Sequence, residues 1–154
     1  MAYWLMKSEP HVYSIDEFKQ DKRTCWNGVR NYQARNMMRD DMKKGDLVLF
    51  YHSSCKQPGV AGIAKVVREG YPDPTNHKGK GKNKGAKKAA NKDPDNPTWF
   101  MVDIQYQHKM KHIISLNEIK AEPLLVDMQL VRRGNRLSVM PVSKQEFERI
   151  LSLE

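Results

Sequence analysis

The segment GDLVLFYHSSCKQPGVAGIAKVVRE, residues 45–69, carries the strongest β-sheet signal in the chain. Two runs rich in β-branched and aromatic residues, 47–54 and 60–69, flank a Gln-Pro-Gly turn at 57–59. Runs of this kind, separated by a short turn containing Gly and Pro, predict a pair of antiparallel strands. The fold is therefore built outward from a β-hairpin in the first half of the chain.

Three further strands are expected on either side of this hairpin. The apolar run at 2–6 predicts a short buried strand, and TWFMVDIQYQHKMKHI at 98–113 predicts a long one. RLSVMPVS at 136–143 predicts the last strand. Prolines at both ends of 70–97 predict that this stretch is a loop outside the sheet.

Short helices are expected between these strands, because Ser followed three residues later by Glu forms a capping box. This pattern predicts helices that begin at Ser14, Ser115 and Ser143. Asn31 is expected to cap a helix over 32–43 with Ala34, Met38 and Met42 on one face. A short helical piece is favoured over a strand at 124–133. About five or six strands with short helices around them predict an α+β fold with a small, curved or barrel-like mixed sheet.

Length and composition limit the class of protein. The 154 residues suit a single domain, 1–154, and the apolar fraction of 39% suits a globular core. No apolar stretch is long enough for a membrane span and no secretory signal is visible, so the cytoplasm is expected, or the nucleus in a eukaryote. The two cysteines, 30 residues apart, indicate neither a disulfide framework nor a structural zinc site.

Most of the net charge of +9 lies in one segment. KGKGKNKGAKKAANK, residues 78–92, contains seven lysines and no acidic residue, within an expected flexible loop at about 75–93. This segment is either a solvated loop or an arm that holds a nucleic-acid backbone. The lysines assigned to such an arm are Lys78, Lys80, Lys82, Lys84, Lys87 and Lys88.

Catalytic, metal and cofactor sites are not indicated. The chain has no Gly-rich phosphate loop between a strand and a helix. His108 and His112 are four residues apart, but on a strand this spacing separates them by about 13 Å, too far for one metal ion. A non-catalytic protein without a metal or cofactor is expected.

The segment WNGVRNYQARNMMRDD, residues 26–41, favours a recognition site instead. Trp26 is either a core indole or a flat surface on which a nucleobase stacks. Asn31 is either only a helix cap or a paired donor and acceptor for a base edge. The expected ligand-binding residues are Lys7, Ser8, Trp26, Gly28, Arg30, Asn31, Tyr51 and His52.

Six ordered blocks resemble the EVE domain family over almost the whole chain. They are WLMKSEP (4–10), WNGVRNYQARNMMR (26–39), GDLVLFYHS (45–53), GIAKVV (62–67), NPTWFMVD (96–103) and LSVMPVS (137–143). The resemblance implies a PUA-like fold, related to YTH domains that enclose methylated adenine in an aromatic cage. It also implies a reader of modified bases, with Lys7, Ser8 and Trp26 at the positions of that cage.

The resemblance gives the site a mechanism. A modified base, foremost a modified cytosine in DNA, leaves its strand and enters a slot with Trp26 as one wall. Gly28 lets the backbone come close, and Ser8, Asn31 and His52 read the base edge. In YTH domains the loop that corresponds to the lysine-rich segment supplies a second cage wall, and here this segment departs from the family pattern. Tyr51 or Tyr71 is therefore expected to supply the second wall.

Two other functions remain open from the sequence. One is a general PUA-type module that grips structured RNA by its shape, and the other is a pocket for a small molecule such as a nucleoside. Binding to a nucleic-acid backbone weakens steeply with salt, whereas binding of a free nucleoside does not.

Overall fold

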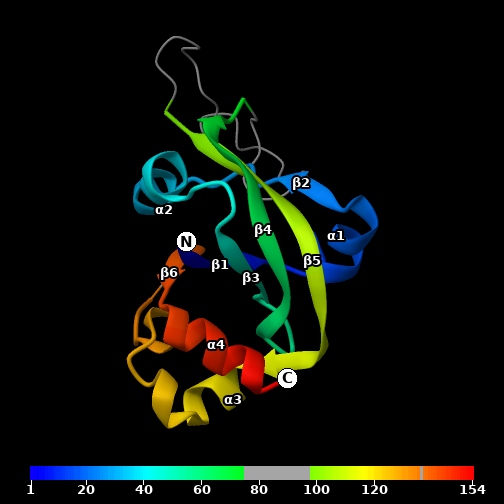
Figure 1. Cartoon of the computed structure of the whole chain (residues 1–154), viewed down its shortest axis with the longest axis vertical. Coiled ribbons are helices and arrows are strands. Elements are labelled where there is room, and N and C mark those ends of the chain that lie inside the picture. Colours follow the sequence, from blue (N-terminus) through cyan, green and yellow to red (C-terminus); the bar gives the residue numbers. More distant parts are fainter. Residues whose placement is uncertain (75–97, 136) are drawn as a thin grey trace.

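A six-stranded mixed sheet forms the centre of the molecule (Figure 1). The structure is a computed structural model, and it describes residues 1–74, 98–135 and 137–154. The strands run in the order β2-β5-β4-β3-β1-β6. Their bounds are β1 Tyr3–Ser8, β2 Arg23–Cys25, β3 Leu47–His52, β4 Gly59–Pro72, β5 Phe100–Ser115 and β6 Val139–Val142.

Short helices connect the strands. The α-helices are α1 Ile15–Asp21, α2 Tyr32–Asn36, α3 Leu116–Ala121 and α4 Lys144–Ser152. A π-helical turn, η1 Met37–Asp41, extends α2, and two 3₁₀ turns are η3 Pro123–Leu125 and η4 Gln129–Val131. The predicted caps are confirmed, because the hydroxyls of Ser14, Ser115 and Ser143 each accept a hydrogen bond from the backbone N–H three residues on.

Strands β1 and β3 are parallel neighbours with apolar residues on both faces. Trp4 and Phe50 point into a core that α1, α2 and η1 cover, whereas Leu5 and Leu49 point into a second core under α3 and α4. Since successive strand residues face opposite sides, a strand between two cores has no polar face. This explains the unbroken apolar runs at the start of the chain and in the hairpin.

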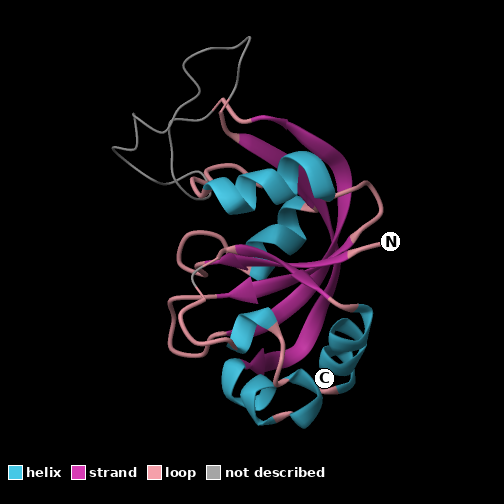
Figure 2. Ribbon diagram, turned by 90° about the vertical axis from the view of Figure 1, so that its left-hand side faces the viewer, coloured by secondary structure: helices cyan, strands magenta, loops and turns pink. Residues whose placement is uncertain are grey.

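The sheet bends strongly but does not close (Figure 2). The three-residue β2 and the four-residue β6 form its two edges. The predicted α+β fold with a curved mixed sheet is confirmed, whereas a closed barrel is not formed. β2 pairs with only three residues of β5, Asp103–Gln105, so among the described residues most of that side of β5 has no partner strand.

Asp46 ties the start of β1 to the start of β3. Its buried carboxylate accepts hydrogen bonds from the Ala2 N–H at 3.0 Å, the Trp4 indole N–H at 3.0 Å and the Lys43 N–H at 2.9 Å. A buried carboxylate is stable only when such donors replace water. Asp46 therefore fixes the parallel register in which Ser8 lies opposite His52.

Several sequence predictions differ from the structure in their bounds, and one strand was not predicted. The loop predicted from residue 70 begins later, because β4 runs on to Pro72 and a strand end tolerates the missing N–H of proline. The helix predicted over 32–43 is an α-helix that changes to a π-helical turn and ends at Asp41. Strand β2 was not predicted, because three residues carry no measurable periodicity.

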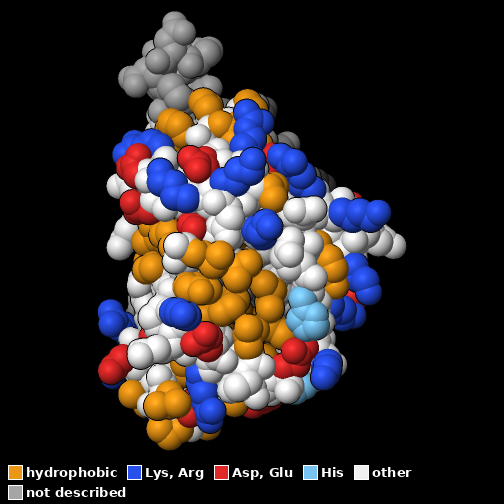
Figure 3. Space-filling view, viewed as in Figure 1, with side chains coloured by type: hydrophobic (Ala, Val, Ile, Leu, Met, Phe, Trp, Pro, Cys, Tyr) orange, Lys and Arg blue, Asp and Glu red, His pale blue; other side chains and the backbone are white. Residues whose placement is uncertain are grey.

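Two further observations concern the helices and one face of the molecule. No helix in the described part of the chain is long and apolar enough to cross a membrane. On the face in Figure 3, Lys and Arg side chains gather over α2 and the upper parts of β4 and β5, above an apolar area at the centre. The lysine-rich segment predicted at 75–93 lies outside the described residues.

Candidate functional site

A cavity of about 540 Å³ opens at the carboxyl-terminal ends of β1 and β3. This volume is within the range of small-molecule sites. Parallel pairing brings the residues after both strands to one edge, and the loop between β2 and α2 closes the opposite side. Its lining residues are Lys7, Ser8, Glu9, Val12, Trp26, Asn27, Gly28, Val29, Arg30, Asn31, Ser53, Ser54 and Ser138.

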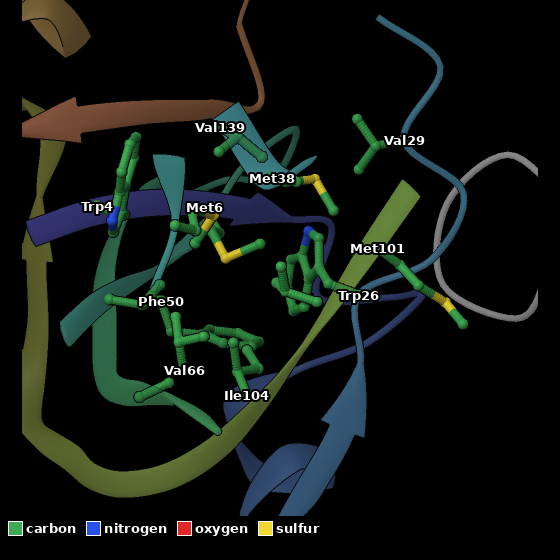
Figure 4. Packing of buried hydrophobic residues seen from close by; sticks show 14 of the residues in the cluster. Trp4, Met6, Trp26, Val29, Met38, Phe50, Val66, Met101, Ile104 and Val139 are labelled. Atoms are coloured by element: carbon green, nitrogen blue, oxygen red, sulfur yellow. The ribbon is translucent and has the colours of Figure 1, made fainter. Parts of the chain in front are cut away.

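Trp26 belongs to both the core and the cavity wall. The residue is only 3% exposed, and its indole meets the Phe50 ring edge-on, with centroids 5.6 Å apart. Figure 4 places it on the side of the apolar cluster nearest Val29 and Met101, with Trp4 at the opposite end. Trp26 is therefore a core indole that also lines the cavity, and its stacking on a nucleobase stays a prediction.

A buried ion pair holds the loop that carries Trp26. The Arg30 guanidinium lies 3.1 Å from the Asp73 carboxylate, and their side chains are 5% and 0% exposed. The same carboxylate accepts a hydrogen bond from the Gly28 N–H at 2.7 Å, and Gly28 has φ 82°, a value that favours glycine. Asp73 thus neutralises Arg30 and fixes the loop, so Arg30 is committed to the wall of the cavity.

Lys7 and Ser8 form the floor at the end of β1. The Ser8 hydroxyl donates to the Tyr13 carbonyl at 2.6 Å, which leaves its oxygen as an acceptor. The Lys7 ammonium lies 5.9 Å from the centre of the Tyr51 ring, and partial burial lowers the pKa of Lys7. No carboxylate of the described residues forms an ion pair with Lys7. Lys7 is therefore placed to meet an anionic or carbonyl group of a ligand.

Asn31 lies at the rim. Its side-chain oxygen accepts a hydrogen bond from the Ala34 N–H at 3.0 Å and so caps α2. The remaining NH₂ group of this carboxamide is a donor. The predicted cap is confirmed, and the same side chain lines the cavity.

Three residues expected at the site lie outside the cavity lining. Tyr51 is buried in the second core, and the His52 Nε2 accepts a hydrogen bond from the Ile15 N–H at 3.1 Å. The Tyr71 hydroxyl donates to the Asp103 carboxylate, and its ring stacks under Arg68. Neither tyrosine faces Trp26 across the cavity, so among the described residues Trp26 is the aromatic lining residue.

Several lining residues were not singled out from the sequence. Asn27 follows Trp26 directly, and Ser53 and Ser54 follow β3. Asp73 supports the wall from a position 45 residues away from Gly28. The sequence offered a signal for Asn27, Ser53 and Ser54, because each is a polar residue beside Trp26 or directly after a buried strand. It offered none for Asp73, whose contact with Gly28 forms only in the folded protein.

The described residues offer no metal centre. Nowhere among them do three His, Cys, Asp or Glu side chains gather closely enough to hold an ion. His108 and His112 lie on β5 and contact Glu154 and Glu118.

Comparison with known proteins identifies the family of this chain. The profile of the EVE domain matches residues 2–153. The chain belongs to the EVE domain family. Human thymocyte nuclear protein 1 is 43% identical over 172 residues, which cover 99% of this chain and 74% of that protein. The zebrafish protein of the same name, from Danio rerio, is 44% identical over 174 residues and is covered to 71% of its length, against 98% of this chain.

Solved structures of similar proteins superpose closely on this one. A crystal structure of a Pseudomonas syringae protein has a TM-score of 0.88 and 42% identity, covering 99% of both chains. A crystal structure of human thymocyte nuclear protein 1 in complex with DNA containing 5-methylcytosine has a TM-score of 0.86 and 42% identity. It covers 99% of this chain and 97% of the human one.

A YTH domain from Zygosaccharomyces rouxii, solved with N6-methyladenosine RNA, has a TM-score of 0.57 at 10% identity. It covers 99% of this chain and 85% of that one. At this identity the likeness concerns the fold alone. Together with the human structure, this likeness is consistent with the PUA-like α+β fold that the sequence resemblance implies.

Proposed function

We propose that this EVE domain is a non-catalytic reader of modified cytosine in DNA, acting in the nucleus if the chain is eukaryotic and in the cytoplasm otherwise. The base leaves the duplex and enters the cavity at the ends of β1 and β3. One observation carries the proposal: the cavity that contains Trp26 also contains Lys7, Ser8, Gly28, Arg30 and Asn31. The complex of a 42% identical human relative with 5-methylcytosine DNA supports this choice of ligand.

The polar groups of the cavity suit a base and its phosphate. The Asn31 NH₂ donates to a ring acceptor, the Ser8 oxygen accepts, and the Lys7 ammonium meets a phosphate or carbonyl oxygen. Stacking and hydrogen bonds offset the few kcal/mol that unstacking a base costs. A methyl group adds apolar area, and about 0.8 kcal/mol per buried carbon corresponds to a roughly fourfold gain in affinity.

Binding requires a local rearrangement around Trp26. Because Trp26 is only 3% exposed, little of its ring is open to an incoming base. A base that stacks on its face displaces the groups that cover it, so binding is coupled to movement of the surrounding wall. The Gly28 backbone and the Arg30–Asp73 pair hold the part of that wall that remains in place.

A binding titration tests the proposal. Duplexes that differ only in one central cytosine or 5-methylcytosine are compared by fluorescence anisotropy at two salt concentrations. We expect about fourfold tighter binding to the methylated duplex at both salt concentrations, while both affinities fall as salt rises. Equal affinity for the two duplexes would reject the proposal in favour of recognition by shape.

Variants connect this preference to the cavity. Trp26→Phe reduces the preference because the smaller ring covers less of the base. Trp4→Phe is the matched control, since Trp4 lies in the same core cluster but does not line this cavity. The control is expected to lower stability and to leave the preference unchanged.

A further inference from the structure

Asn27 carries an acceptor that the described structure leaves unsatisfied. The residue lines the cavity between Trp26 and Gly28. Its side-chain oxygen, Oδ1, is buried and accepts no hydrogen bond among the described residues. Buried polar groups in native proteins nearly always have a partner, and an acceptor without one costs free energy. This oxygen therefore calls for a donor from outside the described protein.

The neighbouring donors are already engaged. The backbone N–H of Trp26 donates to the Val102 carbonyl at 2.7 Å, and the backbone N–H of Gly28 donates to the Asp73 carboxylate at 2.7 Å. The Ser8 hydroxyl donates to the Tyr13 carbonyl. Each of these bonds fixes the cavity wall, so none of the three donors turns to Asn27 without loosening it. A ligand that enters the cavity can supply the N–H or O–H group that these three donors do not.

We propose that the Asn27 Oδ1 accepts a hydrogen bond from the exocyclic amino group of the extruded base, and so distinguishes 5-methylcytosine from thymine. Both bases carry a methyl group at position 5, so apolar contacts do not separate them. Cytosine has an amino donor at position 4, where thymine has a carbonyl acceptor. Thymine would bring this carbonyl against the Asn27 oxygen and leave both acceptors buried without a donor.

Asn31 complements Asn27 within the same cavity. The oxygen of Asn31 is used by the Ala34 N–H, so its NH₂ group is the part that donates to a base. One acceptor from Asn27 and one donor from Asn31 match the amino group and the ring acceptors of cytosine. This inference rests on the proposed function and adds the group that rejects thymine.

The test uses the full chain and three duplexes with one variable base opposite guanine. The variable base is 5-methylcytosine, thymine or 5-methyl-2-pyrimidinone, which lacks any group at position 4. We expect the wild-type protein to bind 5-methylcytosine about tenfold tighter than either other base. The thymine–guanine mismatch opens more easily than a matched pair, which works against this expectation and makes the comparison stringent.

Variants assign the effect to Asn27. Asn27→Leu keeps the branched shape without the acceptor, and Asn27→Ala removes the side chain beyond its Cβ; both are expected to bring the tenfold ratio close to one. Asn27→Asp retains an acceptor oxygen and is expected to keep the ratio, although its charge weakens binding to every duplex. Asn36→Leu changes an asparagine outside the cavity and serves as the control.

Each outcome separates this inference from the proposed function. Suppose that the protein still prefers 5-methylcytosine to cytosine but binds 5-methylcytosine and 5-methyl-2-pyrimidinone equally. This result overturns the role of Asn27 and leaves the proposed function standing. An unchanged ratio in Asn27→Leu and Asn27→Ala has the same meaning. Loss of any preference for 5-methylcytosine over cytosine in the wild-type protein overturns the proposed function.

Discussion

Asp73 accepts hydrogen bonds from both Gly28 and Arg30 at a site closed to solvent. Replacing it by Asn leaves the Arg30 charge buried without its counter-ion. We expect Asp73→Asn to lower the free energy of unfolding by about 3 kcal/mol, measured by urea denaturation. The control is Asp40→Asn in the exposed Arg39–Asp40 pair, where no measurable change is expected. Wild-type stability in Asp73→Asn would mean that this ion pair does not hold the cavity wall.

His52 gives the protein a pH-dependent contribution to stability. Burial lowers the pKa of His52 below its ordinary 6.5, outweighing the nearby Asp16, which raises the pKa; Lys109 lowers it further. The Ile15 N–H also needs the lone pair of Nε2, so protonation breaks that bond. Because the unfolded chain binds the proton more readily, the contribution is complete above pH 6.5 and is lost as pH falls through the lower folded pKa.

This dependence is measurable by comparison with a variant that does not titrate. Between about pH 7.5 and about pH 5.5, the free energy of unfolding of the wild type is expected to fall more than that of His52→Gln. Gln retains an oxygen that accepts from the Ile15 N–H. Parallel pH profiles for the two proteins would show that His52 is not the titrating group.

At the level of elements, helix α4 depends on its capping box. The Ser143 hydroxyl accepts from the Glu146 N–H at 3.1 Å, and the Glu146 carboxylate accepts from the Ser143 N–H at 2.9 Å. Ser143→Ala is expected to cost about 1 kcal/mol of unfolding free energy. Ser143→Asp keeps an N-cap acceptor and is expected to remain close to wild type. Equal stability of the Ala and Asp variants would contradict this account.

The sequence predicted those elements whose signals are local. Capping boxes at Ser14 and Ser143, and the hairpin around Gly59, depend on neighbouring residues and matched the structure. β2 and the extension of β4 to Pro72 depend on pairing with β5, which no local pattern records.

The cavity residues also divide into those with a local sequence signal and those placed by contacts between distant parts of the chain. Lys7, Ser8 and Trp26 were visible as polar and aromatic residues beside expected strands, and the structure brings them together. The buried contact of Gly28 with Asp73 spans 45 residues and was not visible. His52 was assigned to the ligand, but its acceptor nitrogen is used by α1, because a side chain at a strand end has a choice of partners that only the packing decides.

At the scale of the whole molecule, charge and base selectivity are expected to be separable. The net charge of +9 is concentrated in the lysine-rich segment, whereas the cavity lies at the ends of β1 and β3. Changing Lys78, Lys80, Lys82, Lys84, Lys87 and Lys88 to Gln is expected to weaken binding to every duplex and to reduce its salt dependence. The ratio of affinities for 5-methylcytosine and cytosine should stay constant; a large fall in this ratio would place base recognition in that segment.

The central claim is that a base turned out of its strand enters the cavity and reaches Trp26. The most direct test is an NMR spectrum of a duplex with one 5-methylcytosine whose methyl group is carbon-13 labelled. On binding, the methyl resonance is expected to shift under the indole ring current and to show NOE contacts with Trp26 ring protons. A methyl group that keeps its duplex shift and contacts only its flanking bases, while the protein is bound, would contradict the account.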